Sequence, residues 1–325
     1  MRFGIIGTNW ITESFIAAAS EVEGFTLTAV YSRTKERAQE FAAKHGAENI
    51  YTDLNDFASS DKIDAVYIAS PNSLHNEQAI LCMKNKKHVL CEKPIASNTR
   101  ELQEMIRVAK EQKVLLMEAL KTTYLPNFIT IKENLHKIGK IRRYSASYCQ
   151  YSSRYDKYKE GIILNAFKPE FSNGSLMDIG IYTIYPMVVL FGAPLSIKAN
   201  AVMLDSGVDG QGSVLFEYPG MEAVITHSKI VNSYVPAEIQ GEAGTMVIDK
   251  IHTPEMVQIF YKDGTSEDIS VPQKSNSMYY EAQEFMNLVN NGTLEPTINS
   301  FTNSMSTHGI LEEARKQIDL VYPAD

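Results

Sequence analysis

The sequence predicts an α/β protein with a doubly wound parallel sheet first and a mostly antiparallel sheet after it. In residues 1–120, short apolar runs alternate with stretches of helical periodicity, which is typical of right-handed βαβ units. Between residues 196 and 271, strand-like runs follow one another, separated by turn signals such as Tyr218-Pro219-Gly220. We therefore expect two domains, residues 1–120 and 121–325.

Each element of the first domain is predicted from its hydrophobic periodicity. Strands are expected over residues 2–6, 25–31, 49–51, 65–69, 88–91 and 114–118. Helices are expected over residues 12–22, 34–44, 76–85 and 98–112.

The second domain opens with a helix, a strand and a long apolar helix, over residues 126–137, 140–151 and 176–191. The strands that follow are expected over residues 196–203, 212–218, 221–228, 237–241, 245–248 and 256–261. Two helices, residues 278–290 and 300–320, close the chain.

Composition and charge exclude several classes of function. The 325 residues are 44% hydrophobic and 22% charged, as in an ordinary globular protein that buries a core without disulfides. The net charge of -8, with no block of Lys and Arg, argues against nucleic acid and anionic membranes as partners. No segment is expected to reach the apolar length that a bilayer span needs. The cytoplasm is the expected location.

Cysteine and histidine spacing predicts neither a disulfide framework nor a metal site. Cys82, Cys91 and Cys149 are odd in number and show no C-x-x-C spacing. Free thiols suit a reducing compartment, and we interpret Cys82 and Cys91 as core residues. The seven histidines have no metal-ligand spacing, so no metal is expected.

The turn after the first strand has the position of a dinucleotide phosphate site. There the N–H groups at the start of a helix, and its positive dipole end, can meet a pyrophosphate. Of three glycines in the full fingerprint only Gly7 is present, because Asn9 and Thr12 stand at the other two positions. Asn9 tolerates a positive φ, and Thr12 is small. The same residues also make a good turn without a ligand. The cofactor residues predicted here are Gly7, Thr8, Asn9, Trp10 and Ile11.

The end of the second strand favours NADP over NAD. An NAD site usually has an acidic residue there for the ribose hydroxyls, and none is present. Ser32 and Arg33, with Arg37 nearby, can hydrogen-bond a 2′-phosphate instead. NAD remains possible, and a solvated helix start is the alternative interpretation.

Glu92-Lys93-Pro94 ends the apolar run of residues 88–91. A charged pair at the carboxyl end of a parallel strand is not explained by core packing, and ligands bind at that edge of open sheets. The proline restricts the backbone that carries Lys93.

Together, these motifs resemble one family, the Gfo/Idh/MocA oxidoreductases. The matching segments are Gly4-Ile5-Ile6-Gly7-Thr8, Ser70-Pro71-Asn72 with His75, Glu92-Lys93-Pro94, and residues 174–182, read Gly-Ser-Leu-Met-Asp-Ile-Gly-Ile-Tyr. The last is similar to the branch of glucose–fructose oxidoreductase and dimeric dihydrodiol dehydrogenases. The resemblance implies a Rossmann domain, then a domain with a large open-faced sheet that often mediates dimers or tetramers.

The resemblance also implies roles for individual residues. Ser70, Pro71 and Asn72 would line the cofactor cleft with His75 close by, for which we favour a cleft-lining role. Glu92 would contact the ribose of the nicotinamide half, beside Pro94. Lys93 would be catalytic, and Asp178 and Tyr182 would face it from the second domain.

The chemistry of hydride transfer supports these three residues independently. A partner must move the hydroxyl proton, and Tyr, with a pKa of about 10, needs a nearby ammonium to do so efficiently. Lys93 can serve Tyr182 in this way or hydrogen-bond the substrate itself. Asp178 lies four residues before Tyr182, on the same face of the expected helix. Alternatively, Asp178 is a helix cap and Tyr182 a core residue.

Substrate recognition departs from the family pattern. Thr123 stands where many relatives have Arg, in Lys121-Thr122-Thr123-Tyr124-Leu125-Pro126. Lys121 is expected to supply positive charge, and Asn165 to border the substrate pocket.

The predicted function is an NADP-preferring oxidoreductase acting on a secondary alcohol or carbonyl of a sugar, polyol or trans-dihydrodiol. It would work as a homodimer or homotetramer joined through the C-terminal sheet. Two alternatives remain open, a nicotinamide-nucleotide sensor without turnover and a lyase or glycosidase that uses the nicotinamide transiently.

Overall fold

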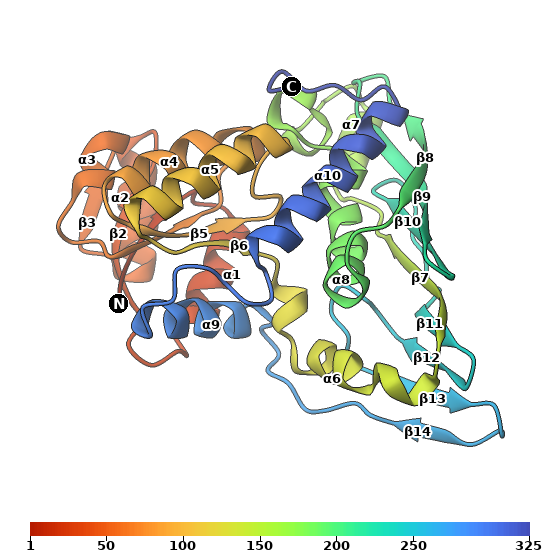
Figure 1. Cartoon of the computed structure of the whole chain (residues 1–325). Coiled ribbons are helices and arrows are strands. Elements are labelled where there is room, and N and C mark those ends of the chain that lie inside the picture. Colours follow the sequence, from red (N-terminus) through yellow and green to blue (C-terminus); the bar gives the residue numbers. More distant parts are fainter. The chain divides into compact units, whose positions relative to one another are not determined.

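A computed structural model describes all 325 residues, which form two compact units (Figure 1). The first unit contains Met1–Lys121 and Lys274–Phe301, and the second contains Thr122–Gln273 and Thr302–Asp325. The chain therefore returns to the first unit late in the sequence. The division into domains at residue 120 stays a prediction.

The first unit is built on a six-stranded parallel sheet, strand order β3-β2-β1-β4-β5-β6, which confirms the doubly wound arrangement. The strand order reverses direction beside β1, and this is the place where α/β sheets of this kind bind nucleotides. The strands are β1 (Arg2–Ile6), β2 (Thr26–Tyr31), β3 (Asn49–Tyr51), β4 (Ala65–Ile68), β5 (His88–Glu92) and β6 (Leu116–Ala119).

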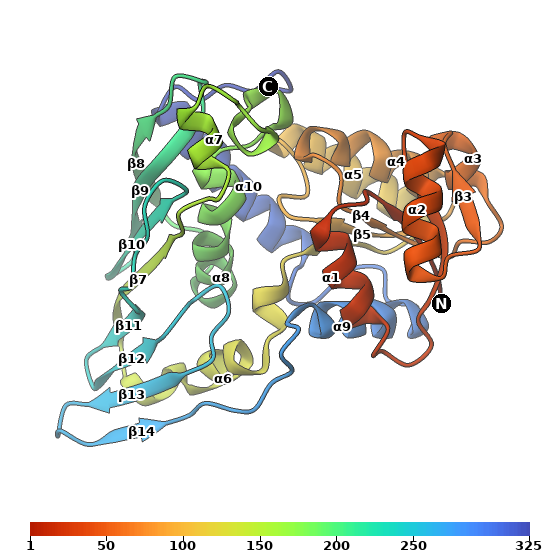
Figure 2. The same ribbon diagram turned by 180° about the vertical axis from the view of Figure 1, so that it is seen from behind.

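Helices cover both faces of this sheet. α1 packs beside α9, as Figure 2 shows, and α4 packs beside α5. One helix, α3, was not expected; Asp53 caps it by accepting from the backbone N–H groups of Asn55 and Asp56 at 2.8 and 3.0 Å. The helices are α1 (Trp10–Ala19), α2 (Lys35–His45), α3 (Leu54–Ser59), α4 (His75–Lys84), α5 (Thr99–Gln112) and α9 (Met278–Asn290).

The late segment is held to the first unit by apolar packing and polar contacts. Phe285 of α9 lies 5.7 Å from the ring centroid of Phe3, which is itself fully buried. The Asn276 side chain donates to the carbonyl of Ser14 at 2.9 Å. Because Phe3 lies in β1, the core of the first unit needs a helix from the other end of the chain.

The second unit contains an eight-stranded sheet in the order β14-β13-β12-β11-β7-β10-β9-β8. All neighbours are antiparallel except β7 and β10, so the mostly antiparallel sheet is confirmed. The strands are β7 (Ile141–Cys149), β8 (Ser196–Met203), β9 (Asp209–Tyr218), β10 (Met221–Ser228), β11 (Ala237–Gly241), β12 (Gly244–Ile248), β13 (Val257–Tyr261) and β14 (Ser266–Asp268).

Helices cover one face of this sheet. Along several strands buried residues alternate with more exposed ones, so the side chains of the opposite face are the more exposed set. α8 packs on β7 and β10, preceded by a π-helical turn, Leu176–Gly180, that packs on β7, β9 and β10. The expected single helix over residues 176–191 is therefore corrected to a π turn followed by an α-helix. The helices are α6 (Pro126–Asn134), α7 (Tyr155–Lys159), α8 (Ile181–Phe191) and α10 (Phe301–Gln317).

One helical stretch, Pro169–Phe191, is long and apolar enough by composition to cross a membrane. This corrects the expectation that no segment reaches that length. Of its most apolar window, 67% is buried inside the fold, as in a core helix. Such a stretch is weak support for a membrane span.

Candidate active site

The parallel register brings the predicted cofactor residues of the first unit to one edge of its sheet. Ile6 of β1 lies opposite Tyr31 of β2 and Ile68 of β4, and Ile68 lies opposite Cys91 of β5. The segments that follow these strands leave the sheet side by side, at the carboxyl edge. They are residues 7–11, 32–37, 70–72 and 93–94, and Glu92 is itself the last residue of β5.

The turn after β1 requires its glycine but does not use Asn9 as expected. Gly7 has φ +104°, and a Cβ there would lie 2.5 Å from the carbonyl oxygen of Ala69. Asn9 has φ -103°, so its tolerance of positive φ is not the reason for its presence. Its Oδ1 instead accepts from the N–H groups of Ile11 and Thr12, and its Nδ2 donates to the Ala69 carbonyl at 2.9 Å. Asn9 thus caps α1 and ties it to the end of β4.

Arg37 holds the turn after β1 from the neighbouring helix. Its guanidinium donates to the Thr8 hydroxyl at 3.1 Å and to the Thr8 carbonyl at 2.5 Å. A third nitrogen forms an ion pair with Glu40 at 2.8 Å. Ser32 is half-buried and Arg33 is exposed, just beyond the end of β2. The edge beside β2 therefore presents positive charge that is available to an anionic ligand.

His75 braces two loops of this edge from inside. Its side chain is fully buried, and its ring nitrogens lie 2.9 Å from the carbonyl oxygens of Ser70 and Pro94. Burial lowers the pKa of His75, which favours the neutral ring. The ring lies between the Ser70 loop and the Lys93-Pro94 loop and has no exposed surface, and its cleft-lining role stays a prediction.

Glu92 is the last residue of β5 and is buried. The Tyr67 hydroxyl donates to one carboxylate oxygen at 2.6 Å, and the N–H of Lys93 donates to the other at 3.2 Å. Burial raises the pKa of Glu92, and the neighbouring cations Lys93 and Lys121 oppose that effect. Because both oxygens already have protein partners, Glu92 fixes the backbone at Lys93.

A second buried carboxyl, Glu281 of α9, lies near Glu92 and was missed in the sequence. Its side chain is fully buried, and neither oxygen has a hydrogen-bond partner. Burial, and next the charge of Glu92, raise its pKa well above the usual value, while Lys121 lowers it. A local pattern does not reveal such a residue, because its neighbours come from the other end of the chain.

In the second unit, Asp178 forms an ion pair with a lysine that sequence reasoning also missed. Lys229, 4% exposed, donates to Asp178 Oδ2 at 2.7 Å and to the carbonyl of Ala166 at 2.9 Å. Its ammonium also lies 5.0 Å from the ring centroid of Phe167. Asn165, the predicted substrate residue, is exposed and directly precedes Ala166. The structure thus connects the Asn165 segment to Asp178 through one buried cation.

The backbone around Asp178 is fixed by a buried aspartate. Asp209 Oδ2 accepts from the N–H of Leu176 at 2.6 Å, at the start of the π turn. His227 Nδ1 lies 2.9 Å from the Ser175 hydroxyl. Burial raises the pKa of Asp209 to about 6 and lowers that of His227 to about 3. This polar cluster explains why the sequence motif contains Gly174-Ser175-Leu176. The contacts of these residues hold the backbone that leads to Asp178.

Tyr182 is half-buried in the first turn of α8 and has aromatic neighbours. Its ring meets Tyr148 of β7 edge-on, with centroids 5.7 Å apart. Tyr148 in turn stacks on His252, with centroids 3.8 Å apart and planes at 2°. Asp178 lies within the π turn and Tyr182 in the α-helix that follows it, so the expected i,i+4 geometry of a regular α-helix does not apply to this pair.

The remaining predictions concern Lys121, Thr123 and the cysteines. Lys121 is half-buried just past β6, and Thr123, at the position of the usual Arg, is fully buried. Cys82 and Cys91 are buried as expected, and burial raises the pKa of Cys82 to about 12, so these are core thiols. No group of three or more His, Cys, Asp or Glu side chains comes together as a metal site requires.

Comparison with known families supports the same interpretation. Residues 1–120 match the model described as the oxidoreductase family with an NAD-binding Rossmann fold, GFO_IDH_MocA. Residues 130–247 match the GFO/IDH/MocA C-terminal domain.

Several curated relatives match over full length, among them the following two. The scyllo-inositol 2-dehydrogenase (NADP(+)) IolU of Bacillus subtilis is 61% identical, over 100% of this chain and 99% of its own. A trans-1,2-dihydrobenzene-1,2-diol dehydrogenase of Danio rerio is 31% identical, over 100% and 99%.

Among solved structures, KijD10, a 3-ketoreductase from Actinomadura kijaniata in complex with NADP and TDP-benzene, superposes with a TM-score of 0.86. It is 24% identical, and the match covers 98% of each chain, which establishes the shared fold.

Proposed function

The chain belongs to the Gfo/Idh/MocA family of oxidoreductases, and from this premise we propose an NADP-dependent dehydrogenase of a cyclic polyol or sugar. The reaction interconverts a secondary alcohol and its ketone. The observation that carries the proposal is the 61% identity, over the whole chain, with a dehydrogenase named for scyllo-inositol and NADP(+). A trans-dihydrodiol, named in relatives of 31% identity and below, is the second candidate substrate.

The carboxyl edge of the parallel sheet fits NADP. Gly7 makes the turn into α1 possible, and at the start of that helix backbone N–H groups and the helix dipole favour an anion such as a pyrophosphate. Arg33 is exposed and no carboxylate stands at the end of β2, so a 2′-phosphate meets positive charge there. Arg37 supports the turn through Thr8. The Ser70-Pro71-Asn72 loop and the Glu92-Lys93-Pro94 loop complete the proposed cofactor site.

Three side chains are proposed to handle the substrate hydroxyl and its proton. The bound nicotinamide supplies the hydride acceptor or donor. Tyr182 exchanges the hydroxyl proton, and the Lys93 ammonium lowers the pKa of that tyrosine or hydrogen-bonds the substrate oxygen. Asp178 orients Lys93 or a second hydroxyl of the substrate. Lys121 and Asn165 are the proposed substrate contacts at the margin.

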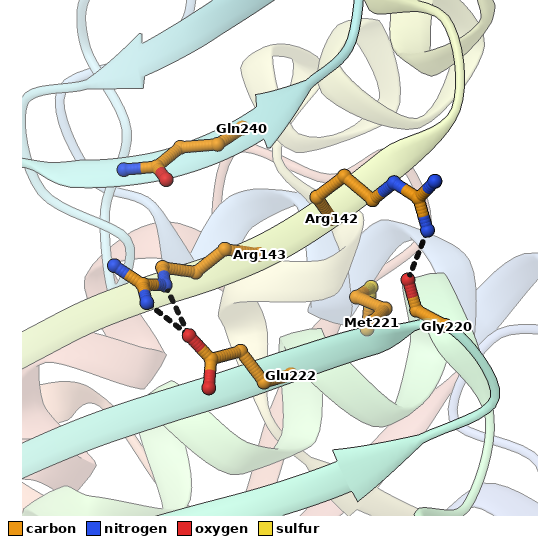
Figure 3. A pocket seen from close by; sticks show the side chains of 6 residues that line it. All are labelled: Arg142, Arg143, Gly220, Met221, Glu222 and Gln240. Atoms are coloured by element: carbon orange, nitrogen blue, oxygen red, sulfur yellow. Dashed lines mark hydrogen bonds and ion pairs between the residues drawn. The ribbon is translucent and has the colours of Figure 1, made fainter.

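We also propose that copies of the chain associate through the outer face of the eight-stranded sheet. Figure 3 shows the charged part of this face, where Arg143 of β7 pairs with its register partner Glu222 of β10. Arg142 donates to the carbonyl of Gly220 at 2.9 Å. Leu215 and Phe260 are 54% and 47% exposed in strands of the same sheet.

The three free cysteines support the proposal of a cytoplasmic location.

A substrate panel with both cofactors tests the function. Cyclitols, sugars and trans-dihydrodiols are offered with NADP and with NAD, and the reduced-cofactor absorbance is followed. We expect the largest kcat/KM with scyllo-inositol and NADP. In the same assay, Lys93→Met and Tyr182→Phe should lose roughly 10²-fold or more in kcat while still binding NADP.

A matched pair of variants tests the cofactor preference. Arg33→Ala should raise KM for NADP about 10-fold or more and leave NAD unaffected, since a charge-assisted hydrogen bond is lost. Lys35→Ala, an exposed cation two residues away, should change neither. A preference for NAD would refute the cofactor assignment. Trp10 fluorescence reports NADP binding. A protein that binds NADP but does not reduce it, whichever substrate of the panel is added, would be a sensor or a cofactor-recycling lyase.

A further inference from the structure

We propose that Lys229 is a positioning residue for the reaction, whose buried ammonium holds the Asp178 carboxylate in one orientation and in its ionised form. The inference rests on the proposed function only for the role of Asp178. The contact between the two side chains lies wholly within the second unit and is observed directly.

The backbone at Lys229 is held on both sides. Its N–H donates to the carbonyl of Gly210 at 2.9 Å, and its own carbonyl accepts from Ser152 at 2.8 Å. These bonds continue the ladder just past the end of β10. The side chain therefore starts from a rigid strand end, which is the kind of support that keeps a functional group in place.

The ammonium is surrounded by acceptors that compensate for its burial. Besides Asp178 Oδ2 at 2.7 Å and the Ala166 carbonyl at 2.9 Å, the Asn173 side-chain oxygen lies at 3.5 Å. The Phe167 ring adds a cation–π contact. An ammonium with three acceptors satisfies all of its donors. The site is therefore built to hold a cation, because an unsatisfied buried cation would be strongly destabilising.

The ion pair is asymmetric, and this favours a role in the site over a purely structural one. The Lys229 side chain is 4% exposed, whereas that of Asp178 is 32% exposed. The cation lies inside, and the carboxylate is presented at the surface of the unit. A pair that only tied the fold together would have no need for this difference.

Other titratable groups lie around the pair and set its electrostatic environment. Asp209 of β9 is stabilised in its charged form by Lys229, and His227 of β10 lies 3.7 Å from that aspartate. Tyr322, whose hydroxyl donates to the Asn173 carbonyl at 2.9 Å, experiences the charge of Asp178. Lys229 donates directly to Asp178, so its loss removes a positive charge that favours the carboxylate.

A series of variants tests the proposal. Lys229→Met removes the charge at similar length, Lys229→Arg keeps it, and Lys250→Met is the control at an exposed lysine. We expect Lys229→Met to lower kcat about 10²-fold, to move the acid limb of the kcat/KM profile to higher pH, and to leave the Kd for NADP within about twofold. Lys229→Arg should retain part of the lost rate, and Lys250→Met should behave as wild type.

Asp178→Asn separates positioning from stability. If Lys229 acts through Asp178, adding Lys229→Met to Asp178→Asn should cost less than threefold further in kcat, because the two effects are not additive. Full additivity would overturn the proposal, as would an unchanged kcat and pH profile in folded Lys229→Met. If Lys229→Met does not fold, Lys229→Gln takes its place, because it also removes the charge but can still donate to the Ala166 carbonyl. An unchanged kcat and pH profile in folded Lys229→Gln would likewise overturn the proposal.

A crystal structure of Lys229→Met tests the positioning role without measuring the reaction. We expect the Asp178 side chain to leave its present rotamer once its partner at 2.7 Å is lost. An unmoved Asp178 would overturn the inference even for an active enzyme. A moved Asp178 in a protein that turns over no polyol would instead refute the proposed function and leave the positioning role supported.

Discussion

Glu281 shows how a single residue can carry both a stability cost and an electrostatic role. Its carboxyl is fully buried without a hydrogen bond, beside Glu92 at the carboxyl edge of the parallel sheet. Burying an unsatisfied acid disfavours the charged form, so its pKa rises well above the unfolded value. The folded protein then binds a proton that the unfolded chain releases. Stability due to this group is therefore complete below about pH 4.3 and is lost as pH rises through the folded pKa.

Glu281→Gln should accordingly stabilise the protein at neutral and alkaline pH. We expect Tm at pH 8 to rise by roughly 2–4 °C or more, with the gain shrinking toward pH 5, because Gln does not ionise. Thermal unfolding followed by circular dichroism across this range measures the effect. Glu48→Gln, at an exposed glutamate, serves as the control and should change nothing. A gain that grew as the pH fell would show that the sign is wrong.

At the scale of elements, the π-helical turn at Leu176–Gly180 decides where Asp178 and Tyr182 lie. Apolar periodicity predicted one helix over residues 176–191, and the element exists, but its first turn has wider hydrogen bonding. The cause is tertiary: Asp209 accepts from the N–H of Leu176, and Ser175 pairs with His227. Sequence periodicity does not record such partners from β9 and β10.

Gly174 is the residue through which this cluster can be tested. Its φ is +150°, and a Cβ would lie 2.1 Å from Asp209 Oδ1. Gly174→Ala should lower the free energy of unfolding by roughly 3 kcal/mol or more, since strain and a steric clash add. Gly292→Ala is a matched control, with φ +67° and nothing within 4 Å of its Cβ, and should cost roughly 1–2 kcal/mol. Urea denaturation measures both, and equal losses would contradict a special role for Asp209.

At the scale of the whole molecule, the chain uses its late segment in its first unit. The sequence predicted helix 278–290 with the bounds that α9 has, but within a domain of residues 121–325. In the structure α9 belongs with Met1–Lys121, packed against Phe3 and α1. An amphipathic pattern shows that a helix buries one face. It does not show which of the two hydrophobic cores that face packs against.

The proposed association through the outer sheet face predicts a particle of at least two chains. Light scattering on the eluting protein should give twice the chain mass of 36.4 kDa, or a higher multiple. Leu215→Lys combined with Phe260→Lys should shift the protein toward single chains, because both side chains lie exposed on that sheet. Val321→Lys, at an exposed apolar residue outside the sheet, should leave the mass unchanged. A wild-type protein of 36.4 kDa would refute the association.

The sequence by itself determined the order of the main elements, the parallel and antiparallel sheets, and the family, although it did not indicate α3, α7 and β14. These follow from local periodicity and from short motifs, such as Gly7 at a turn where only glycine fits. It also identified the segments that the parallel register gathers at one sheet edge, since each of them begins at or just after the end of a strand.

Only the tertiary structure decided which side chains support the site. Lys229 at Asp178, Asp209 beneath the π turn, His75 between two loops, and Glu281 near Glu92 each depend on contacts between distant segments. Burial and electrostatics are properties of those contacts, so a buried lysine at residue 229 is indistinguishable in sequence from one in solvent. Residue identity selects the chemistry that is available, and packing determines which of these groups are held in place to perform it.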